Sequence, residues 1–226
     1  MLTSFPNYIA IIGDIKGSKK IDNRNKVQKI MKSLLEDINK KYMDDIYSKF
    51  TITLGDEFQG LLCCGANCMK ILSEIERKLH PIKVRIGVGI GGITTEINRE
   101  ISIGADGPGY YKARTAIEYL KKEEKRKQTN PADIRIEIDG DYKSLSIMLN
   151  TILSLMTAIK ESWTDRQREI IWDMMEHQDS QLDVAKRLGI TQSSVQKGLS
   201  NGKYYAYKDA FDTIEKLLEE TRSKYV

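Results

Sequence analysis

Residues 50–62 read FTITLGDEFQGLL, and this stretch decides the fold. Apolar and polar residues alternate over 50–54, and residues 58–62 are mainly apolar, so the pattern predicts two strands joined as a β-hairpin. Asp56 and Glu57 lie at the tip of that hairpin, where packing gives no reason for acid. Because carboxylate oxygens are the ligands that Mg²⁺ prefers, the tip is a candidate cation site. An ordinary polar turn is the alternative interpretation.

A second acidic position, Asp14, ends a segment that is predicted to be a buried strand. Residues 8–13 form a near-continuous apolar run, which is typical of such a strand. Gly17 and Ser18 follow, and the backbone N–H groups of a strand-to-helix turn can hold a phosphate. Three lysines nearby add positive charge, namely Lys16, Lys19 and Lys20. A polar loop in front of a helix is the alternative interpretation.

Four segments in sequence order resemble the catalytic domain of class III nucleotidyl cyclases and of their diguanylate cyclase (GGDEF) relatives. The segments are residues 14–18, 53–58, 84–93 and 104–120. The resemblance implies an α+β fold, namely a ferredoxin-like domain of the cyclase or palm type with a mainly antiparallel sheet. Domains of those families bind Mg²⁺ and a nucleoside triphosphate and commonly pair. We therefore expect Mg²⁺ as the cofactor, a nucleotide as the ligand and a homodimer as the assembly.

The resemblance also implies three groups of site residues, carried over position by position. The metal ligands would be Asp14 and Asp56. The residues that meet the nucleotide would be Ile15, through its backbone carbonyl, with Gly17, Ser18 and Gly55. The catalytic residues would be Arg114, which meets transition-state charge, and Lys112.

The residues that read the base in adenylyl and guanylyl cyclases are missing from the pattern. The position of the ribose-orienting Asn falls on Tyr110, and the two purine-reading positions fall on Ile52 and Ile103. Leu54 replaces the first Gly of GGDEF, which disfavours a cyclic-di-GMP synthase. The sequence therefore has the cyclase residues expected to bind metal and phosphate, but lacks those that bind the base. Either the substrate differs, or the site binds a nucleotide without cyclising it.

Residues 182–199 resemble the helix-turn-helix of sigma-factor and LuxR-type regulators. Gly189 allows the tight turn, Ala185 allows two helices to cross closely, and Val195 is placed to pack inward. The outward side chains suited to the bases and phosphates of duplex DNA are Lys186, Gln192, Ser193, Ser194, Gln196 and Lys197. Residues 184–208 contain five Lys/Arg and no acid, so the motif is locally basic. A helical bundle that makes protein contacts is the alternative.

The composition is that of an ordinary soluble protein, with 40% hydrophobic and 30% charged residues and a formal net charge of +4. No apolar run approaches the ~20 residues that a membrane span needs, and the N-terminus lacks the pattern of a signal peptide. The three cysteines cluster at Cys63, Cys64 and Cys68, which fits a reducing compartment better than a disulfide framework. We therefore expect a cytoplasmic protein that does not enter a membrane.

The two halves together predict a two-domain chain, a combination that resembles the SatD family. Residues 1–140 are expected to form the nucleotidyl cyclase-like palm domain, and residues 141–226 an all-α domain with the helix-turn-helix. The leading hypothesis is a nucleotide-responsive DNA-binding regulator with a Mg²⁺–nucleotide site. An active nucleotidyl cyclase or nucleotidyltransferase is the first alternative, and a non-catalytic interaction scaffold is the second.

Overall fold

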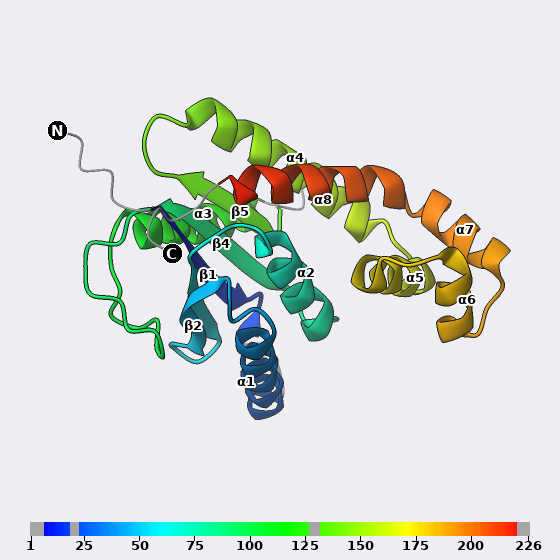
Figure 1. Cartoon of the computed structure of the whole chain (residues 1–226), viewed down its shortest axis with the longest axis horizontal. Coiled ribbons are helices and arrows are strands. Elements are labelled where there is room, and N and C mark those ends of the chain that lie inside the picture. Colours follow the sequence, from blue (N-terminus) through cyan, green and yellow to red (C-terminus); the bar gives the residue numbers. More distant parts are fainter. Residues whose placement is uncertain (1–6, 19–22, 127–131, 221–226) are drawn as a thin grey trace.

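The predicted hairpin becomes part of a five-stranded sheet (Figure 1). The computed structural model describes residues 7–18, 23–126 and 132–220. The strands are β1 (Tyr8–Ile15), β2 (Ile46–Ile52), β3 (Glu57–Leu62), β4 (Val84–Gly91) and β5 (Ile134–Ile138). The helices are α1 (Arg24–Lys41), α2 (Cys68–Leu79), α3 (Pro108–Arg126), α4 (Lys143–Glu161), α5 (Asp165–His177), α6 (Gln181–Leu188), α7 (Gln192–Asn201) and α8 (Tyr204–Glu219). None of these described helices is long and apolar enough to cross a membrane.

β1 lies at the centre of the sheet, whose strand order is β2-β3-β1-β4-β5. β1 pairs antiparallel with both β3 and β4, and β2 pairs antiparallel with β3. The first four strands with α1 and α2 follow the βαββαβ order of a ferredoxin-like fold. β5 joins the edge in parallel with β4, because α3 makes the long crossover that parallel strands require. The sheet is therefore mixed, in an α+β fold.

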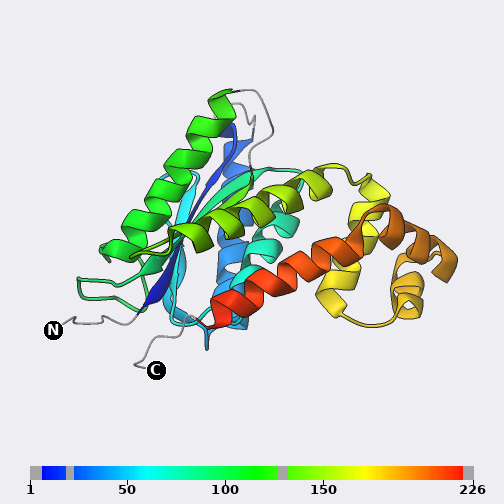
Figure 2. The same ribbon diagram turned by 90° about the horizontal axis from the view of Figure 1, so that it is seen from above.

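Alternate residues of β1 enter two different cores, as the period of two in a strand requires. Ile9 and Ile11 belong to the larger core, which includes buried residues of α1 and α2. Ala10 and Ile12 pack with Ile117 of α3 in a smaller core. α3 therefore covers one face of the sheet, and α1 and α2 cover the other (Figure 2).

Glycines in β4 let α3 approach the sheet at backbone distance. A Cβ atom added at Gly89 would lie 2.0 Å from the carbonyl oxygen of Gly109 and 2.3 Å from the backbone nitrogen of Ala113. Only a glycine leaves room for another backbone to come so close. The contact fixes where the rest of α3 runs, and its charged C-terminal half extends over the end of β1 that carries Asp14.

The C-terminal helices pack against the sheet part of the molecule. α4 covers the edge strand β5, where the amide of Asn150 accepts from the N–H of Ile136 at 2.9 Å and donates to its carbonyl at 2.7 Å. These bonds satisfy backbone groups that an edge strand leaves unpaired. α8 runs back beside α4 and contacts α2 (Figures 1 and 2). The boundary expected at residue 140 falls in the connection between β5 and α4 and stays a prediction.

We predict that Gly89→Ala destabilises the fold by about 3 kcal/mol, the upper end for overpacking, because backbone atoms of α3 would have to move. Gly198→Ala is the matched control, since its added methyl would first meet the δ-methyl of Ile170, at 2.6 Å, the end of a flexible side chain. Urea unfolding measures both free energies. Equal losses in the two variants would contradict the close approach of α3 to β4.

Candidate functional site

Asp14 lies near the end of the central strand with a charged residue opposite it on each neighbouring strand. The register pairs Asp14 with Glu57 of β3 and with Arg85 of β4. Residues directly opposite in antiparallel strands point to the same face of a sheet. Asp14, Glu57 and Arg85 therefore share the face that α3 covers, and Asp14 is only 6% exposed.

The hairpin tip and the end of β1 enclose an open pocket of about 450 Å³. Its described lining residues are Asp14, Ile15, Gly17, Ser18, Leu54, Asp56, Glu57, Arg85 and Lys121. The structure thus brings together both predicted metal ligands and three of the four predicted nucleotide-contacting residues. The fourth, Gly55, has a φ of +62° at the hairpin tip, and its carbonyl accepts from the side chain of Gln28 at 2.6 Å. Lys19 and Lys20 lie outside the described residues.

The two predicted catalytic residues lie elsewhere on α3 and are not among the described residues that line this pocket. The ammonium of Lys112 lies 3.7 Å from the carboxylate of Asp139, and Arg114 is exposed. Lys121, two turns further along the same helix, takes the place beside Asp14. A single copy of the chain therefore presents Lys121, and neither Lys112 nor Arg114, to the pocket.

Asp14 is held between two cations. Its Oδ2 lies 2.6 Å from Nζ of Lys121, and its Oδ1 lies 3.2 Å from Nε of Arg85. The second contact lacks hydrogen-bond geometry, so Asp14 Oδ1 is buried without a hydrogen-bond partner among the described residues. A buried polar atom left without a hydrogen bond costs about 1–3 kcal/mol. Asp14 Oδ1 therefore keeps an unused capacity to accept a hydrogen bond or a cation, beside its ion pair with Arg85.

A hard cation fits this donor set, provided that it brings further ligands. Asp14, Asp56 and Glu57 supply carboxylate oxygens at the pocket. Within the described residues, however, no group of three or more His, Cys, Asp or Glu side chains is arranged to hold a metal ion. Mg²⁺ usually takes one or two carboxylates and completes its shell with water and substrate phosphates. Mg²⁺ that arrives with phosphate is thus the cation that the pocket suits.

The three residues at the base-reading positions do not join the acids in the described lining of the pocket. Tyr110 is 2% exposed in the core between α3 and the sheet, and this burial raises the pKa of its phenol. Ile103 is half exposed in the loop before α3, and Ile52 ends β2. None of the three is among the described lining residues of the pocket, so one copy of the chain offers a base no selective hydrogen bond at these positions.

The sequence analysis did not predict that Arg85 and Lys121 line the pocket. Arg85 could have been identified from the sequence, because a charged residue within the apolar strand 84–91 needs a partner of opposite charge when it is buried. Lys121 could not, since it belongs to the charged run 121–126 that reads as a solvated helix surface.

The predicted DNA-contacting residues are all exposed on α6 and α7. Gly189 ends α6 in the left-handed conformation, and the side chain of Thr191 caps α7 by accepting from the N–H of Ser194. Val195 and Leu199 of α7 are buried, as expected of inward positions. The six outward residues are Lys186, Gln192, Ser193, Ser194, Gln196 and Lys197, each of them exposed.

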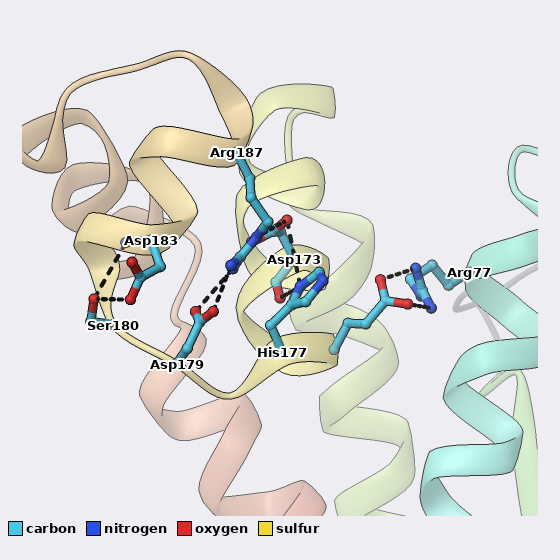
Figure 3. Close-up of polar contacts among 8 residues, drawn as sticks. Arg77, Asp173, His177, Asp179, Ser180, Asp183 and Arg187 are labelled. Carbon is cyan, nitrogen blue, oxygen red and sulfur yellow. Dashed lines mark hydrogen bonds and ion pairs between the residues drawn. The ribbon is translucent and has the colours of Figure 1, made fainter.

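Arg187 fixes the corner between α5 and α6, as Figure 3 shows. Its guanidinium donates to Asp173 of α5 at 2.6 Å and to Asp179 of the connecting turn at 2.5 Å. The hydrogen bonds from Arg187 lower the pKa of Asp179. Arg77 of α2 donates to Glu176 at 2.5 and 2.7 Å, which joins α5 to the helix beneath the sheet. Arg187 is thus occupied within the protein, whereas Lys197 and Lys186 are exposed, the latter beside Asp183 of its own helix at 3.4 Å.

Comparison with known proteins gives one family and several distant structures. A model described as the SatD family matches residues 8–217. A bacterial light-regulated adenylyl cyclase is 15% identical over 58% of this chain and 75% of its own, with a TM-score of 0.43. The catalytic core of a rhodopsin-guanylyl cyclase with converted specificity is 18% identical over 62% and 82%, with a TM-score of 0.39.

A dimeric guanylyl cyclase domain of the RhoGC fusion protein from the aquatic fungus Blastocladiella emersonii is 17% identical over 58% and 79% of the two chains, with a TM-score of 0.40. No curated protein matches the chain. Because the structural scores are low, the chemistry of the pocket rests on its own residues.

We predict that Arg85→Met costs about 3 kcal/mol of stability, because it leaves the buried carboxylate of Asp14 and that of Glu124 short of a cation. Lys121→Met is the matched control on the same carboxylate. The side chain of Lys121 is 42% exposed, so solvent screens its ion pair and the loss should stay below about 1 kcal/mol. Urea unfolding measures both values, and a larger loss for Lys121→Met would contradict the assigned burial of the Asp14–Arg85 pair.

Proposed function

The chain belongs to the SatD family, and we propose that its pocket between Asp14 and Asp56 binds a magnesium–nucleoside triphosphate. The observation that carries the proposal is the state of Asp14, which is buried and has a carboxylate oxygen without a hydrogen-bond partner among the described residues. Asp14 lines a pocket that Asp56, Gly17 and Ser18 also line. The residues proposed to hold the cation and those proposed to hold the phosphate thus line one pocket.

The charges around the pocket give binding a physical reason. Asp14, Asp56 and Glu57 line one pocket, so their negative charges repel, and a divalent cation bound there would relieve that repulsion. Lys121 now neutralises one oxygen of Asp14. On entry of Mg²⁺ with phosphate, we expect its ammonium to leave Asp14 for the phosphate oxygens, where the bound anion offers more negative charge.

We propose that a site with these residues binds the triphosphate without cyclising it. Cyclisation needs the ribose hydroxyl held close to the α-phosphate, and such positioning is worth many kcal/mol. Tyr110 is buried in another core, and Arg114 and Lys112 do not join the described lining of the pocket. An active nucleotidyl cyclase or nucleotidyltransferase is the alternative, in which a second copy of the chain would supply its α3. Formation of a cyclic or oligomeric product from labelled ATP or GTP would favour it.

A second function, DNA binding by a homodimer, is favoured by one observation on the C-terminal helices. The six predicted DNA-contacting residues of α6 and α7 are all exposed, and residues 184–208 contain five Lys/Arg and no acid, although Lys186 pairs with Asp183 at 3.4 Å. A single recognition helix reads few base pairs, so two copies related by a twofold axis would gain specificity. The combined proposal is a nucleotide-responsive DNA-binding regulator. If neither ligand binds, a non-catalytic interaction scaffold becomes the better description.

We predict that the double variant Asp14→Asn/Asp56→Asn loses Mg²⁺-dependent binding of ATP and GTP in calorimetric titrations, because both carboxylate ligands are gone. At a ligand concentration of one hundred times Kd, the unaltered protein should gain about 2.7 kcal/mol of stability and the double variant none. Asp44→Asn is the control, since Asp44 is an exposed acid that is not among the described lining residues of the pocket. Binding that is unchanged in the double variant would overturn the proposed site.

We predict that Lys197→Ala weakens DNA binding by a similar factor on every sequence, because its ammonium is expected to meet phosphate rather than a base. The slope of the logarithm of affinity against the logarithm of salt concentration should fall by about one. Lys29→Ala removes another exposed charge, from α1, and serves as the control. Fluorescence anisotropy with labelled genomic fragments measures both, and equal slopes for all three proteins would contradict a role of α7 in DNA binding.

A further inference from the structure

Eight charged side chains of alternating sign form a continuous row of ion pairs, which we call the ion-pair row. In order, its members are Lys121, Asp14, Arg85, Glu124, Lys16, Asp133, Lys160 and Glu76. The successive distances are 2.6, 3.2, 3.3, 3.2, 2.9 and 2.9 Å up to Lys160, which then pairs with Glu76. The row begins in the Asp14 pocket and continues on the other face of the sheet.

The far end of the ion-pair row lies where the C-terminal helices leave the sheet. Lys160 is in the last turn of α4, and its backbone carbonyl accepts from the guanidinium of Arg168 in α5 at 3.0 Å. Arg168 lies 5.6 Å from the ring centroid of Trp163 and 5.2 Å from that of Trp172. In the chain, α6 and α7 follow this junction between α4 and α5 (Figure 1). We call their exposed residues the α6–α7 surface, namely Lys186, Gln192, Ser193, Ser194, Gln196 and Lys197.

Burial makes the inner members of the ion-pair row sensitive to their neighbours. Arg85, Asp133 and Lys160 are each no more than 9% exposed, and charges in such surroundings interact more strongly than charges in water. Although burial lowers the pKa of Lys160, the carboxylates of Glu76 and Asp133 together raise it above its usual value. The ammonium of Lys160 therefore stays charged and depends on these two acids.

The alternation of charge gives the ion-pair row a direction of response. A cation bound to Asp14 would repel Lys121 and Arg85, and Arg85 would then draw closer to Glu124. Glu124 would hold Lys16 less strongly as a result, so Lys16 would turn more fully to Asp133. Asp133 would in turn attract Lys160 less, which would loosen the end of α4 against the sheet.

We infer that the ion-pair row transmits occupancy of the Asp14 pocket to the junction of α4 and α5, and so to the α6–α7 surface. The inference rests on the proposed function, because a ligand in the pocket starts the response. It requires that the junction has two arrangements and that the ligand favours one of them. It also assigns to Asp133 the part of a positioning residue, which joins the two halves of the row without lining the Asp14 pocket.

The chain provides its own probe for the test. It contains two tryptophans, Trp163 and Trp172, and both lie beside Arg168 at the far end of the row. Mg²⁺ with ATP, with GTP and with inorganic tripolyphosphate is titrated into the full-length protein. Calorimetry measures binding, and tryptophan emission measures the response of the junction. We expect the emission to change with the same midpoint as the heat.

Two variants, Asp133→Asn and Glu124→Gln, interrupt the ion-pair row between Asp14 and Lys160. A third, Glu76→Gln, removes only its last member. Asp133→Asn separates Lys16 from Lys160, yet Lys16 keeps Glu124 and Lys160 keeps Glu76. Glu124→Gln cuts the row one pair earlier, and it serves if Asp133→Asn does not fold. Glu76→Gln is the matched control, because it removes an acid from Lys160 while the row from Asp14 to Lys160 stays continuous.

The variants are compared in ligand affinity and in the change of tryptophan emission. We expect Asp133→Asn and Glu124→Gln to bind the ligand within about tenfold of the unaltered affinity, a change no larger than a typical coupling between sites. Both should lose most of the emission change. Glu76→Gln should keep it. Binding without an emission change in the unaltered protein, a response kept by both cut variants, or an equal loss in all three variants would overturn the ion-pair row as the route. Absence of any heat in the unaltered protein would instead overturn the proposed function itself.

Discussion

The structure depends on one buried carboxylate, that of Asp14 at the end of the central strand. A charge in such a place has to be paired, because the cost of removing it from water exceeds what folding can spare. Arg85 on the neighbouring strand and Lys121 on the helix above supply the pairing. These partners connect the sheet to α3 and start the series of ion pairs that reaches α4.

The glycines of β4 determine whether α3 comes close enough to the sheet to pair with the charge of Asp14. Gly87 and Gly89 let the backbone of α3 lie against the sheet, and the same helix then places Lys121 and Glu124 over the charged end of β1 and β4. A bulkier β4 would hold α3 further away and leave Asp14 and Arg85 without these partners. The shape of the apolar face therefore determines the electrostatics of the pocket beside it.

Local patterns in the sequence were enough to predict β1 and the hairpin of β2 and β3, although β2 runs from Ile46 to Ile52 and ends two residues before the expected position. The run 8–13, the alternation over 50–54 and the turn at Gly55 each depend on neighbours in the sequence. The partner of Asp14 could not be predicted in this way, because it depends on how α3 crosses the sheet. Arg114 and Lys121 share that helix, but about 10 Å of helix axis separates them, and only the crossing decides which one meets Asp14.

In the C-terminal helices too, features set by neighbouring residues can be predicted from the sequence, whereas contacts between distant segments cannot. Thr164, Ser180 and Thr191 cap their helices through side-chain hydrogen bonds, and such caps can be read from a few residues of sequence. The contact between α8 and the sheet part of the molecule leaves no periodic signal, since Gly65 meets Leu218 across most of the chain. The buried pairing of Lys160 with Glu76 and Asp133 likewise required the assembled fold.

The central claim is that Asp14 and Asp56 together hold a cation that brings phosphate. A crystal structure of the protein with Mn²⁺ and tripolyphosphate tests it most directly, because Mn²⁺ can be located by anomalous scattering. The account predicts an anomalous peak at about 2.1 Å from Oδ1 of Asp14 and from a carboxylate oxygen of Asp56, with the ammonium of Lys121 moved to phosphate. An Asp14–Lys121 pair left intact, with the metal bound elsewhere, would contradict it.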